Sequence, residues 1–417
     1  MPELEVCKTC GVPSVISTIL SWGDNGIISV SYSPKARMVF YESVDIDNVF
    51  RGVERLIGEP IEQIVMERRR RDTRKFMERV FPEEIERMSS FLGEDRVGEV
   101  SSVEPSKRHE MPKTGELLFS PAITFGTVYG YGDIRYSELW EFWDTSPWRN
   151  QIICNPYSII FFSADMLATV EAFEQRDMRI KYEKICDDVY LISALPGEHP
   201  IELADRLKRK IYETKPGDIS YECCPECGVP QDVARYRWNL EEGTIIDPNT
   251  GRRMAFFDPA AVDLVFEDLK AELGESVPEA IIEAQRHYAK LSMSGESWRR
   301  SGFDFKAWAA MRGLGNITAF KSDEKRLTLT LENPSMHLAV VGMAIALYEL
   351  AWNTYCSTHE WHITDDGDLV ITLELYATQV PGTRAAFGLN RLLRRRGRRQ
   401  SAIYVGDRDH HHRNSEQ

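Results

Sequence analysis

The feature that most constrains this chain is a repeated heptapeptide. Residues 7–13 read CKTCGVP, and residues 224–230 read CPECGVP. The residues after each heptapeptide stay in register, apart from one position that the second segment lacks. The matching pairs are Gly26 with Gly243, Ile28 with Ile245, Arg37 with Arg253, Met38 with Met254, Phe40 with Phe256, Asp47 with Asp263, Phe50 with Phe266, Gly58 with Gly274, Glu67 with Glu283, and Arg70 with Arg286. A match of this length indicates a repeated structural unit.

The match resumes further along the chain. The paired segments are 130–134 (GYGDI) with 313–317 (GLGNI), 154–175 with 332–353, and 187–193 with 366–372. The separation falls from 217 to 178 positions, so the extra residues belong to the first copy, mostly within the stretch at 89–115. The sequence therefore predicts two copies of one unit of about 190–220 residues, joined near residues 215–217.

Both copies are predicted to have the same α+β plan. Each begins with a cysteine knuckle, a hairpin and helices, and continues with a second domain of helices and antiparallel strands. The predicted divisions are 1–88 and 216–296 for the two knuckle–hairpin–helix modules, 89–215 and 297–380 for the two second domains, and 381–417 for a basic C-terminal tail.

Local signals place the elements within this plan. A helix over about 49–57 should end at Gly58, and its counterpart should begin at Asp258 and stop at Gly274. The long apolar stretches at 158–173 and 337–352 predict helices that are buried on most sides. The segments expected to pair as strands are 26–42 and 243–258 in the knuckle modules, 178–185 with 189–195, and 358–364 with 369–375.

The composition favours a globular protein and excludes several partners. With 51 Lys and Arg against 65 Asp and Glu, the formal net charge is −14, so general attraction to nucleic acid or to an anionic membrane is not expected. No apolar run approaches the roughly 20 residues of a membrane helix. The first ten residues lack the basic and apolar regions of a secretory signal. We therefore expect a cytoplasmic protein.

The cysteines carry the strongest chemical signal. Eight cysteines in a reducing compartment favour metal binding over disulfides. Each CxxCG knuckle offers two thiolates, and a structural zinc ion takes four ligands in a tetrahedron. We predict that the two copies share one Zn²⁺, bound by Cys7, Cys10, Cys224 and Cys227. Other zinc arrangements, and knuckles that hold no metal or act as a redox dithiol, are the alternatives. Cys223 is expected to be a bystander.

The second part of each copy resembles the 4-vinyl reductase domain. The resemblance covers about residues 130–195 and 313–375, and it depends on the GxG segments, the Asn-Pro dipeptide before a buried helix, and the closing hairpin. That family is related in fold to small subunits of the TRAPP tethering complexes and to sensory domains of aromatic-responsive transcription activators. The resemblance implies an α/β fold with a buried pocket for small, often apolar ligands, sometimes with zinc beside it.

The same resemblance implies a second candidate metal site in the first copy. Its hairpin carries Glu183 and Cys186, which are similar to the Glu-x-x-Cys step of the family, and Cys154 lies nearby in the pattern. The family's usual cysteine after the closing turn is absent. The alternative is that these cysteines are small buried side chains.

Aromatic residues are concentrated at 138–148. We expect Trp140 and Trp143, together with Tyr157, to line a pocket for a flat apolar ligand in the first copy. The alternative is a segment that seals the core. The second copy has KSDEKRLTLTL at the corresponding place, so its pocket should be filled by its own side chains. These are expected to be Met336, Met343 and Trp352.

Two basic segments stand out in an acidic chain. The run Arg68–Arg71 lies in a predicted helix with acidic neighbours, and we expect it to be a solvated face. The stretch RLLRRRGRR at 391–399 follows the last repeat match and either binds an acidic protein partner or nucleic acid, or is a solvated tail. Of the two partners, nucleic acid is the less expected.

No catalytic motif is present: the sequence has no P-loop, no HExxH and no dinucleotide fingerprint. The favoured hypothesis is a zinc-containing protein that binds or senses a small apolar or aromatic ligand in the first copy. One alternative is an enzyme, or a subunit of one, that uses Glu183 as acid or base beside a metal. Another is a structural or assembly partner of an enzyme complex.

Overall fold

The computed structural model describes residues 4–31, 33–92, 111–138, 146–204, 212–293, 304–354 and 357–375. The predicted tail at 381–417, with its basic run, lies outside the described residues, as do Trp140 and Trp143. Below, "first half" means the described residues up to 204, and "second half" means those from 212 onward.

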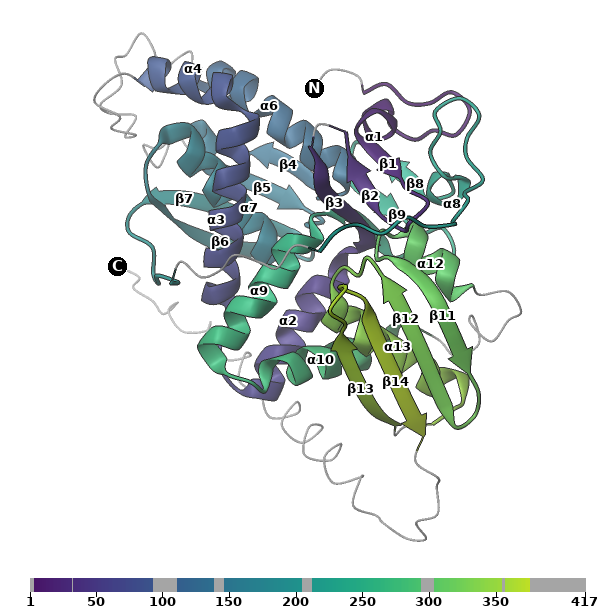
Figure 1. Cartoon of the computed structure of the whole chain (residues 1–417). Helices are drawn as coiled ribbons and strands as arrows, with labels where there is room; N and C mark the ends of the chain where they lie inside the picture. The colour runs from purple at the N-terminus through teal and green to yellow at the C-terminus, as the bar shows by residue number, and fades with distance from the viewer. Residues whose placement is uncertain are drawn as a thin grey trace, which may run out of the picture. The chain divides into compact units, whose positions relative to one another are not determined.

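A six-stranded antiparallel sheet is built from both halves (Figure 1). Its order is β1-β2-β3-β10-β9-β8, so the first half supplies one side and the second half the other. The two central strands pair Phe40 with Phe256, and the two rings stack with centroids 4.5 Å apart. Residues that match in the sequence repeat therefore meet at the middle of the sheet. The strands are β1 (Leu20–Trp22), β2 (Ile28–Val30), β3 (Ser33–Glu42), β8 (Arg237–Asn239), β9 (Thr244–Ile246) and β10 (Arg253–Phe257).

Each half also contains a four-stranded antiparallel sheet of its own. The orders are β4-β5-β7-β6 and β11-β12-β14-β13, which are the same path through four strands. The predicted closing hairpins are present as β6 with β7 and β13 with β14. The strands are β4 (Asp133–Tyr136), β5 (Asn150–Cys154), β6 (Met178–Cys186), β7 (Val189–Pro196), β11 (Asn316–Ser322), β12 (Arg326–Glu332), β13 (Ser357–Ile363) and β14 (Leu369–Leu375). All strand pairings in the described residues are antiparallel, so the predicted α+β class is confirmed.

The long helices of the two halves begin and end at the expected signals. Helix α2 (Ser43–Ile57) ends at Gly58, which is left-handed at φ 84°, and Asp258 caps α9 (Pro259–Leu273) by accepting from the amide of Ala260. Helices α7 (Ile159–Glu174) and α13 (His337–Ala351) are buried along nearly their whole length. The remaining helices are α1 (Ser14–Ile19), α3 (Glu62–Val80), α4 (Pro82–Leu92), α6 (Met111–Tyr129), η3 (Pro147–Arg149), α8 (Gln231–Ala234), α10 (Val277–Ser292) and α12 (Phe305–Met311).

The helices pack both within and across the halves. Helix α3 lies along α7, and α10 lies along α13, each within its own half. Helix α2 of the first half packs on α10 of the second, and α9 of the second half packs on α3 of the first. Most of the buried side chains join one apolar core, and a second core lies between the six-stranded sheet and the knuckles.

Two glycine contacts join each GxG segment to the hairpin turn of the opposite half. The amide of Gly132 donates to the carbonyl of Gly243 at 2.9 Å, and the amide of Gly315 donates to the carbonyl of Gly26 at 3.1 Å. A Cβ on Gly26 or Gly243 would overlap the facing carbonyl, so neither position tolerates a side chain. Each hairpin turn is thus fixed against the GxG segment of the opposite half.

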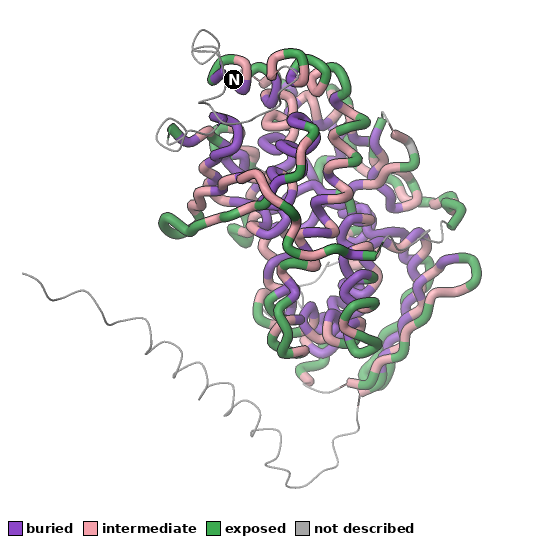
Figure 2. The backbone as a smooth tube through the Cα atoms, turned by 90° about the vertical axis from the view of Figure 1, so that its left-hand side faces the viewer, coloured by how far each residue is buried: buried purple, intermediate pink, exposed green. Residues whose placement is uncertain are grey.

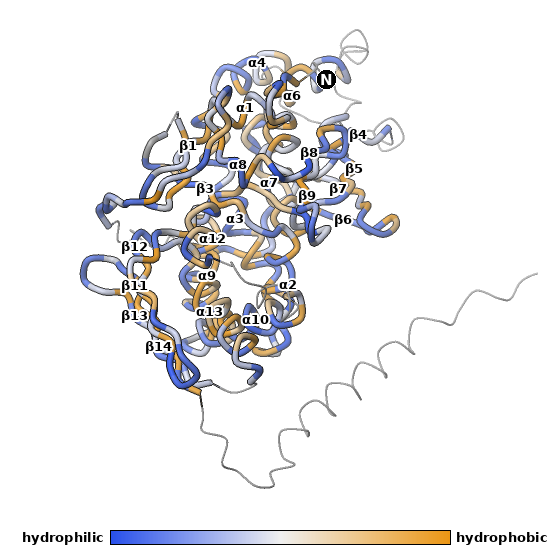
Figure 3. The backbone as a smooth tube through the Cα atoms, turned by 90° about the vertical axis from the view of Figure 1, so that its right-hand side faces the viewer, coloured by the Kyte–Doolittle hydropathy of each residue, from blue (hydrophilic) through white to orange (hydrophobic). Residues whose placement is uncertain are grey.

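Buried and exposed residues separate as this packing requires. Figure 2 shows buried positions in the interior and exposed ones at the ends of hairpins and in loops, and Figure 3 shows the hydrophobic residues following the same interior positions. None of the described helices is long and apolar enough to cross a membrane.

Candidate metal centre and ligand pocket

The four predicted cysteines come together at one point. The Sγ atoms of Cys7 and Cys224 are 3.8 Å apart, and those of Cys10 and Cys227 are 3.5 Å apart. All four sulfurs lie within 4.8 Å of one another, so this group can hold a metal ion. Each cysteine meets its equivalent from the other knuckle, as a shared site between two copies requires.

The two knuckles reach this point with the same backbone geometry. The amide of Cys7 donates to Val12 at 2.8 Å and that of Gly11 donates to Cys7 at 2.8 Å. In the second knuckle the equivalent bonds are 2.9 Å each, and the glycine after the second cysteine has φ 76° in both. The left-handed glycine is needed because the chain must turn back directly behind the sulfur.

The residues fit a tetrahedral thiolate site. Four sulfurs at about 2.3 Å from a central ion would be about 3.8 Å apart, close to the separations observed. Backbone amides of Cys227 and Glu226 lower the pKa of the Cys224 thiol to about 7, which favours the thiolate. Burial raises the pKa of Cys10. A cation between the sulfurs would favour the thiolate form of all four.

One polar contact distinguishes the two knuckles. The carboxylate of Glu226 accepts from both the amide and the hydroxyl of Thr9, at 3.0 and 2.6 Å. The reverse arrangement would need a carboxylate at position 9, the equivalent of Glu226, where the first knuckle has Thr9. Cys223 is exposed and lies outside the four-sulfur group, in agreement with its predicted role as a bystander.

The second predicted metal site is not assembled in the described residues. Cys154 and Cys186 lie at the ends of β5 and β6, which are separated by β7. The Glu183 side chain is 59% exposed and pairs with Lys181 at 2.5 Å. The Glu183 carboxylate therefore lies at the surface and not in a buried pocket, because β6 is an edge strand and its charged side chains face water.

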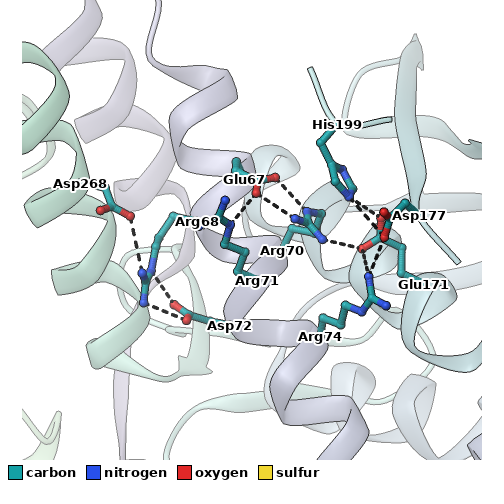
Figure 4. A network of polar contacts seen from close by, with 10 residues as sticks. All are labelled: Glu67, Arg68, Arg70, Arg71, Asp72, Arg74, Glu171, Asp177, His199 and Asp268. Atoms are coloured by element: carbon teal, nitrogen blue, oxygen red, sulfur yellow. Dashed lines mark hydrogen bonds and ion pairs between the residues drawn. The ribbon is translucent and has the colours of Figure 1, made fainter. Parts of the chain in front are cut away.

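A different acidic cluster was missed by sequence reasoning. Glu171, Asp177 and His199 have ligating atoms within 4.8 Å of one another. However, Arg70 lies 2.8 Å from Glu171, and Arg74 lies 2.9 Å from Asp177 (Figure 4). Two guanidinium groups already neutralise these carboxylates and oppose a further cation. The cluster is therefore an ion-pair network.

This network also corrects the expectation for the arginine run. Arg69 and Arg70 are only 8% and 7% exposed, because α3 packs against α7, which provides Asp165 and Glu171 as their acidic partners. Asp268 of α9 pairs with Arg68. The second half repeats the core of the network. Arg286 contacts Glu349 at 2.8 Å and Glu283 at 2.6 Å, as Arg70 contacts Glu171 and Glu67.

The first half contains a pocket of about 210 Å³. Its walls come from α3, α6 and α7, with contributions from β2, β3, β4, β5 and the start of α9, so both halves line it. Most of the lining is apolar. The aromatic and large aliphatic lining residues are Phe76, Met77, Phe81, Phe119, Ile123, Phe125, Tyr129, Tyr131, Ile134, Phe162 and Met166.

The equivalent place in the second half holds only about 10 Å³. The sequence repeat aligns Ala122 with Phe305, Phe125 with Trp308, and Asp165 with Met343. Phe305, Trp308 and Met343 all border this small space, so larger or apolar side chains occupy what is open in the first half. A volume of about 10 Å³ is at the lower limit for one water molecule.

A polar cluster lies at the wall of the larger pocket. Arg69 binds both carboxylate oxygens of Asp165 at 2.6 and 3.1 Å, and Asp165 also accepts from Thr73 and from the Tyr157 hydroxyl at 2.6 and 2.7 Å. Arg69, Thr73 and Asp165 line the pocket, while Tyr157 lies behind it, stacked on Tyr131 at 4.0 Å. The predicted residue Tyr157 thus supports the wall and does not line it.

The other predicted pocket residues have mixed outcomes. Met336 and Met343 are buried, as expected for the filled second half, but Trp352 is 42% exposed because it follows the end of α13. In the aromatic segment, Trp148 is buried, donates to Glu174 at 2.8 Å and packs on Phe119. This tryptophan seals the core, as the alternative interpretation expected.

No protein-family model, curated protein or solved structure matches this chain. Its function must therefore be argued from the metal centre and the pocket.

Proposed function

We propose that this is an internally duplicated zinc protein whose first half binds or senses a small apolar or aromatic ligand. The observation that carries the proposal is the difference between two equivalent places. The pocket in the first half has a volume of about 210 Å³, whereas the equivalent space in the second half has about 10 Å³. Aligned positions that differ this much in volume suggest that the opening has a use.

Contacts between and within the halves support the duplication. Four kinds of contact recur at positions aligned by the repeat: the cysteine pairs, the Phe40–Phe256 stack, the two glycine contacts and the Arg–Glu pairs. The chain would then be a dimer of one unit joined end to end, with its two-fold axis between β3 and β10.

The zinc ion would act as a structural clamp. Four cysteine ligands leave no open coordination position for a substrate or water, which is typical of structural zinc. The site joins segments 217 residues apart, so binding of the ion would hold the two hairpins together.

We further propose that the second part of each half is a 4-vinyl-reductase-like domain. A four-stranded antiparallel sheet with a long buried helix, present in both halves, is compatible with that resemblance. The enzyme alternative loses its named residue, since Glu183 is exposed. The assembly-partner alternative becomes the leading one if the pocket takes no ligand.

A binding screen tests the proposal. Aromatic and short acyl compounds would be screened against the full chain by ligand-detected NMR, with Ala122→Phe as the matched variant, because it installs the residue of the second half. We expect compounds that bind the wild-type protein and not Ala122→Phe. Equal binding to both proteins, or no binding at all, would contradict the proposed pocket.

A further inference from the structure

A polar side chain faces the apolar interior of the larger pocket. Gln151 is 6% exposed, lines the pocket, and lies on the central strand β5. It shares a strand face with the buried Ile153, because alternate residues point to the same side. Among the described residues, nothing hydrogen-bonds to its side-chain amide. An amide that borders an apolar pocket and has no protein partner is available to hydrogen-bond a group bound there.

Arg69 offers a second free donor to the same space. Its Nε and Nη2 atoms bind Asp165, and Nη2 also lies 3.5 Å from the Tyr157 hydroxyl. Its Nη1 group has no partner in the described part of the chain, although Arg69 lines the pocket. The carboxylate of Asp165 holds the guanidinium in place and neutralises it, so a neutral acceptor suits this donor better than a second anion.

The second half shows which residues occupy the aligned positions where the space is filled by protein. The repeat aligns Gln151 with Leu329, which is fully buried, and Asp165 with Met343. Where the space is filled by protein, the strand position is apolar. Where the space is open, it carries an amide. The amide is therefore associated with the open pocket and is not required by the shared fold.

We propose that Gln151 and Arg69 recognise one neutral polar group, a carbonyl, amide or hydroxyl, on a ligand of about one aromatic ring. The inference depends on the proposed ligand-binding function and adds the chemistry of the ligand to it. A cavity of about 150 Å³ is enough to bind benzene, so about 210 Å³ admits one ring with a small substituent. The amide offers both a donor and an acceptor, and Arg69 adds a donor.

Three probes of the same size and shape separate the contribution of the polar group to binding affinity from that of the apolar ring. Benzamide, acetophenone and isopropenylbenzene have the same number of non-hydrogen atoms and differ only in the group beside the ring. Their dissociation constants would be measured by calorimetry on the full chain, as wild type and as Gln151→Leu, the residue of the second half. Gln151→Met, which is closer in shape, serves as a second variant, and thermal midpoints report whether each variant is folded.

The decisive quantity is the change in preference between probes. We expect Gln151→Leu to weaken benzamide binding relative to isopropenylbenzene by at least about fivefold, the worth of one hydrogen bond. An unchanged ratio, with all three probes still bound, would overturn the role of Gln151 and leave the pocket's function standing. Failure of all three to bind the wild-type protein at millimolar concentration would reject both proposals.

Discussion

The two halves of this molecule share a backbone architecture, here called the frame, and differ in the volume of the pocket inside it. Both have the same strand order, the same buried Arg–Glu pair and the same knuckle. The pocket volumes, about 210 and about 10 Å³, differ because of a few side chains. The comparison teaches that backbone contacts and buried charges maintain the architecture, whereas side-chain volume alone opens or closes the interior.

A second difference lies where the halves cross. Helix α2 meets α10 through Gly52 and Ala284, where a Cβ on the glycine would come within 2.6 Å of the alanine Cβ. The equivalent contact between α9 and α3 joins Asp268 to Arg68 at 3.6 Å (Figure 4). Matched positions of the two helix crossings thus carry a small, close-packed pair in one place and an ion pair in the other.

The largest effect is expected at the feature that both halves share. Cys10→Ser and Cys227→Ser should each abolish binding of one zinc ion per chain and destabilise the protein by about 3 kcal/mol or more, since the proposed ion would join both knuckles. Native mass spectrometry and chemical denaturation measure both effects. Because the site is symmetric, the two variants should behave alike.

The neighbouring thiol provides the control for this prediction. Cys223→Ser should retain metal and stability, because Cys223 is exposed and outside the group. Two zinc ions per chain, or a large difference between Cys10→Ser and Cys227→Ser, would contradict a shared site.

The buried ion pairs test whether the shared frame is equally important in both halves. Glu171→Gln and Glu349→Gln each remove a carboxylate with no exposed surface and leave a partly buried arginine with one of its two countercharges. Each should cost about 3 kcal/mol in denaturant unfolding. Exposed Glu183→Gln on β6 should change stability by less than about 0.5 kcal/mol. A negligible effect of Glu349→Gln alone would show that the two frames are not equivalent.

Exchanging the strand residue should affect the two halves in opposite ways. Leu329→Gln places an amide in a filled core and should destabilise the protein by about 2 kcal/mol. Gln151→Leu places an apolar side chain in an open pocket and should leave stability unchanged or slightly raised. Thermal unfolding of both variants measures the contrast. Equal destabilisation by both would mean that Gln151 has a structural partner.

The smallest expected effect is a pH dependence of stability that comes from a residue of the first half alone. Burial, and then the charge of Glu42, raise the pKa of Asp45 well above its usual value. The folded state thus binds this proton more tightly than the unfolded chain, where Asp titrates near about 3.9, so stability falls as pH rises from there through the raised pKa. Asp45→Asn should therefore stabilise the protein more at pH 8 than at pH 5. The aligned residue of the second half is Ala261, which has no such dependence.

Glu349 provides the opposite sign. Burial alone would raise its pKa, but Arg286 and Lys290 lower it overall. Its contribution to stability is present above the unfolded value near about 4.3 and is lost on acidification. The destabilisation by Glu349→Gln should therefore shrink at low pH. A constant difference for both variants across the pH range would contradict these assignments.

The sequence alone was informative where a local signal fixes a local structure. The knuckles, the Gly58 and Asp258 boundaries and the closing hairpins follow from residues close in the chain. The duplicated cysteines even predicted a contact between distant segments, because a zinc ion needs four ligands. The importance of the buried Glu171 and Glu349 could also have been predicted, since both residues interrupt apolar helices at aligned positions.

Other features could not be predicted because they depend on tertiary neighbours. Arg69 and Arg70 look solvated by sequence and are buried because α7 brings the carboxylates of Asp165 and Glu171 to them. Glu183 looked functional by resemblance, but the edge position of β6 exposes it. The importance of Gln151 depends on an open space, which no single-residue pattern reports.

The exchanged glycine contacts also affect how the chain is made. Trp22 and Gly26 of the first hairpin are held by Met311 and Gly315, and the tryptophan bond spans 289 positions. At roughly 5–20 residues per second, the ribosome needs roughly 15–60 s to deliver those partners after the hairpin has emerged. Until then the hairpin lacks these two partners, although other residues of its apolar core, such as Val128 and Tyr129, have already emerged. The first hairpin can therefore reach its final set of contacts only when the second half is nearly complete.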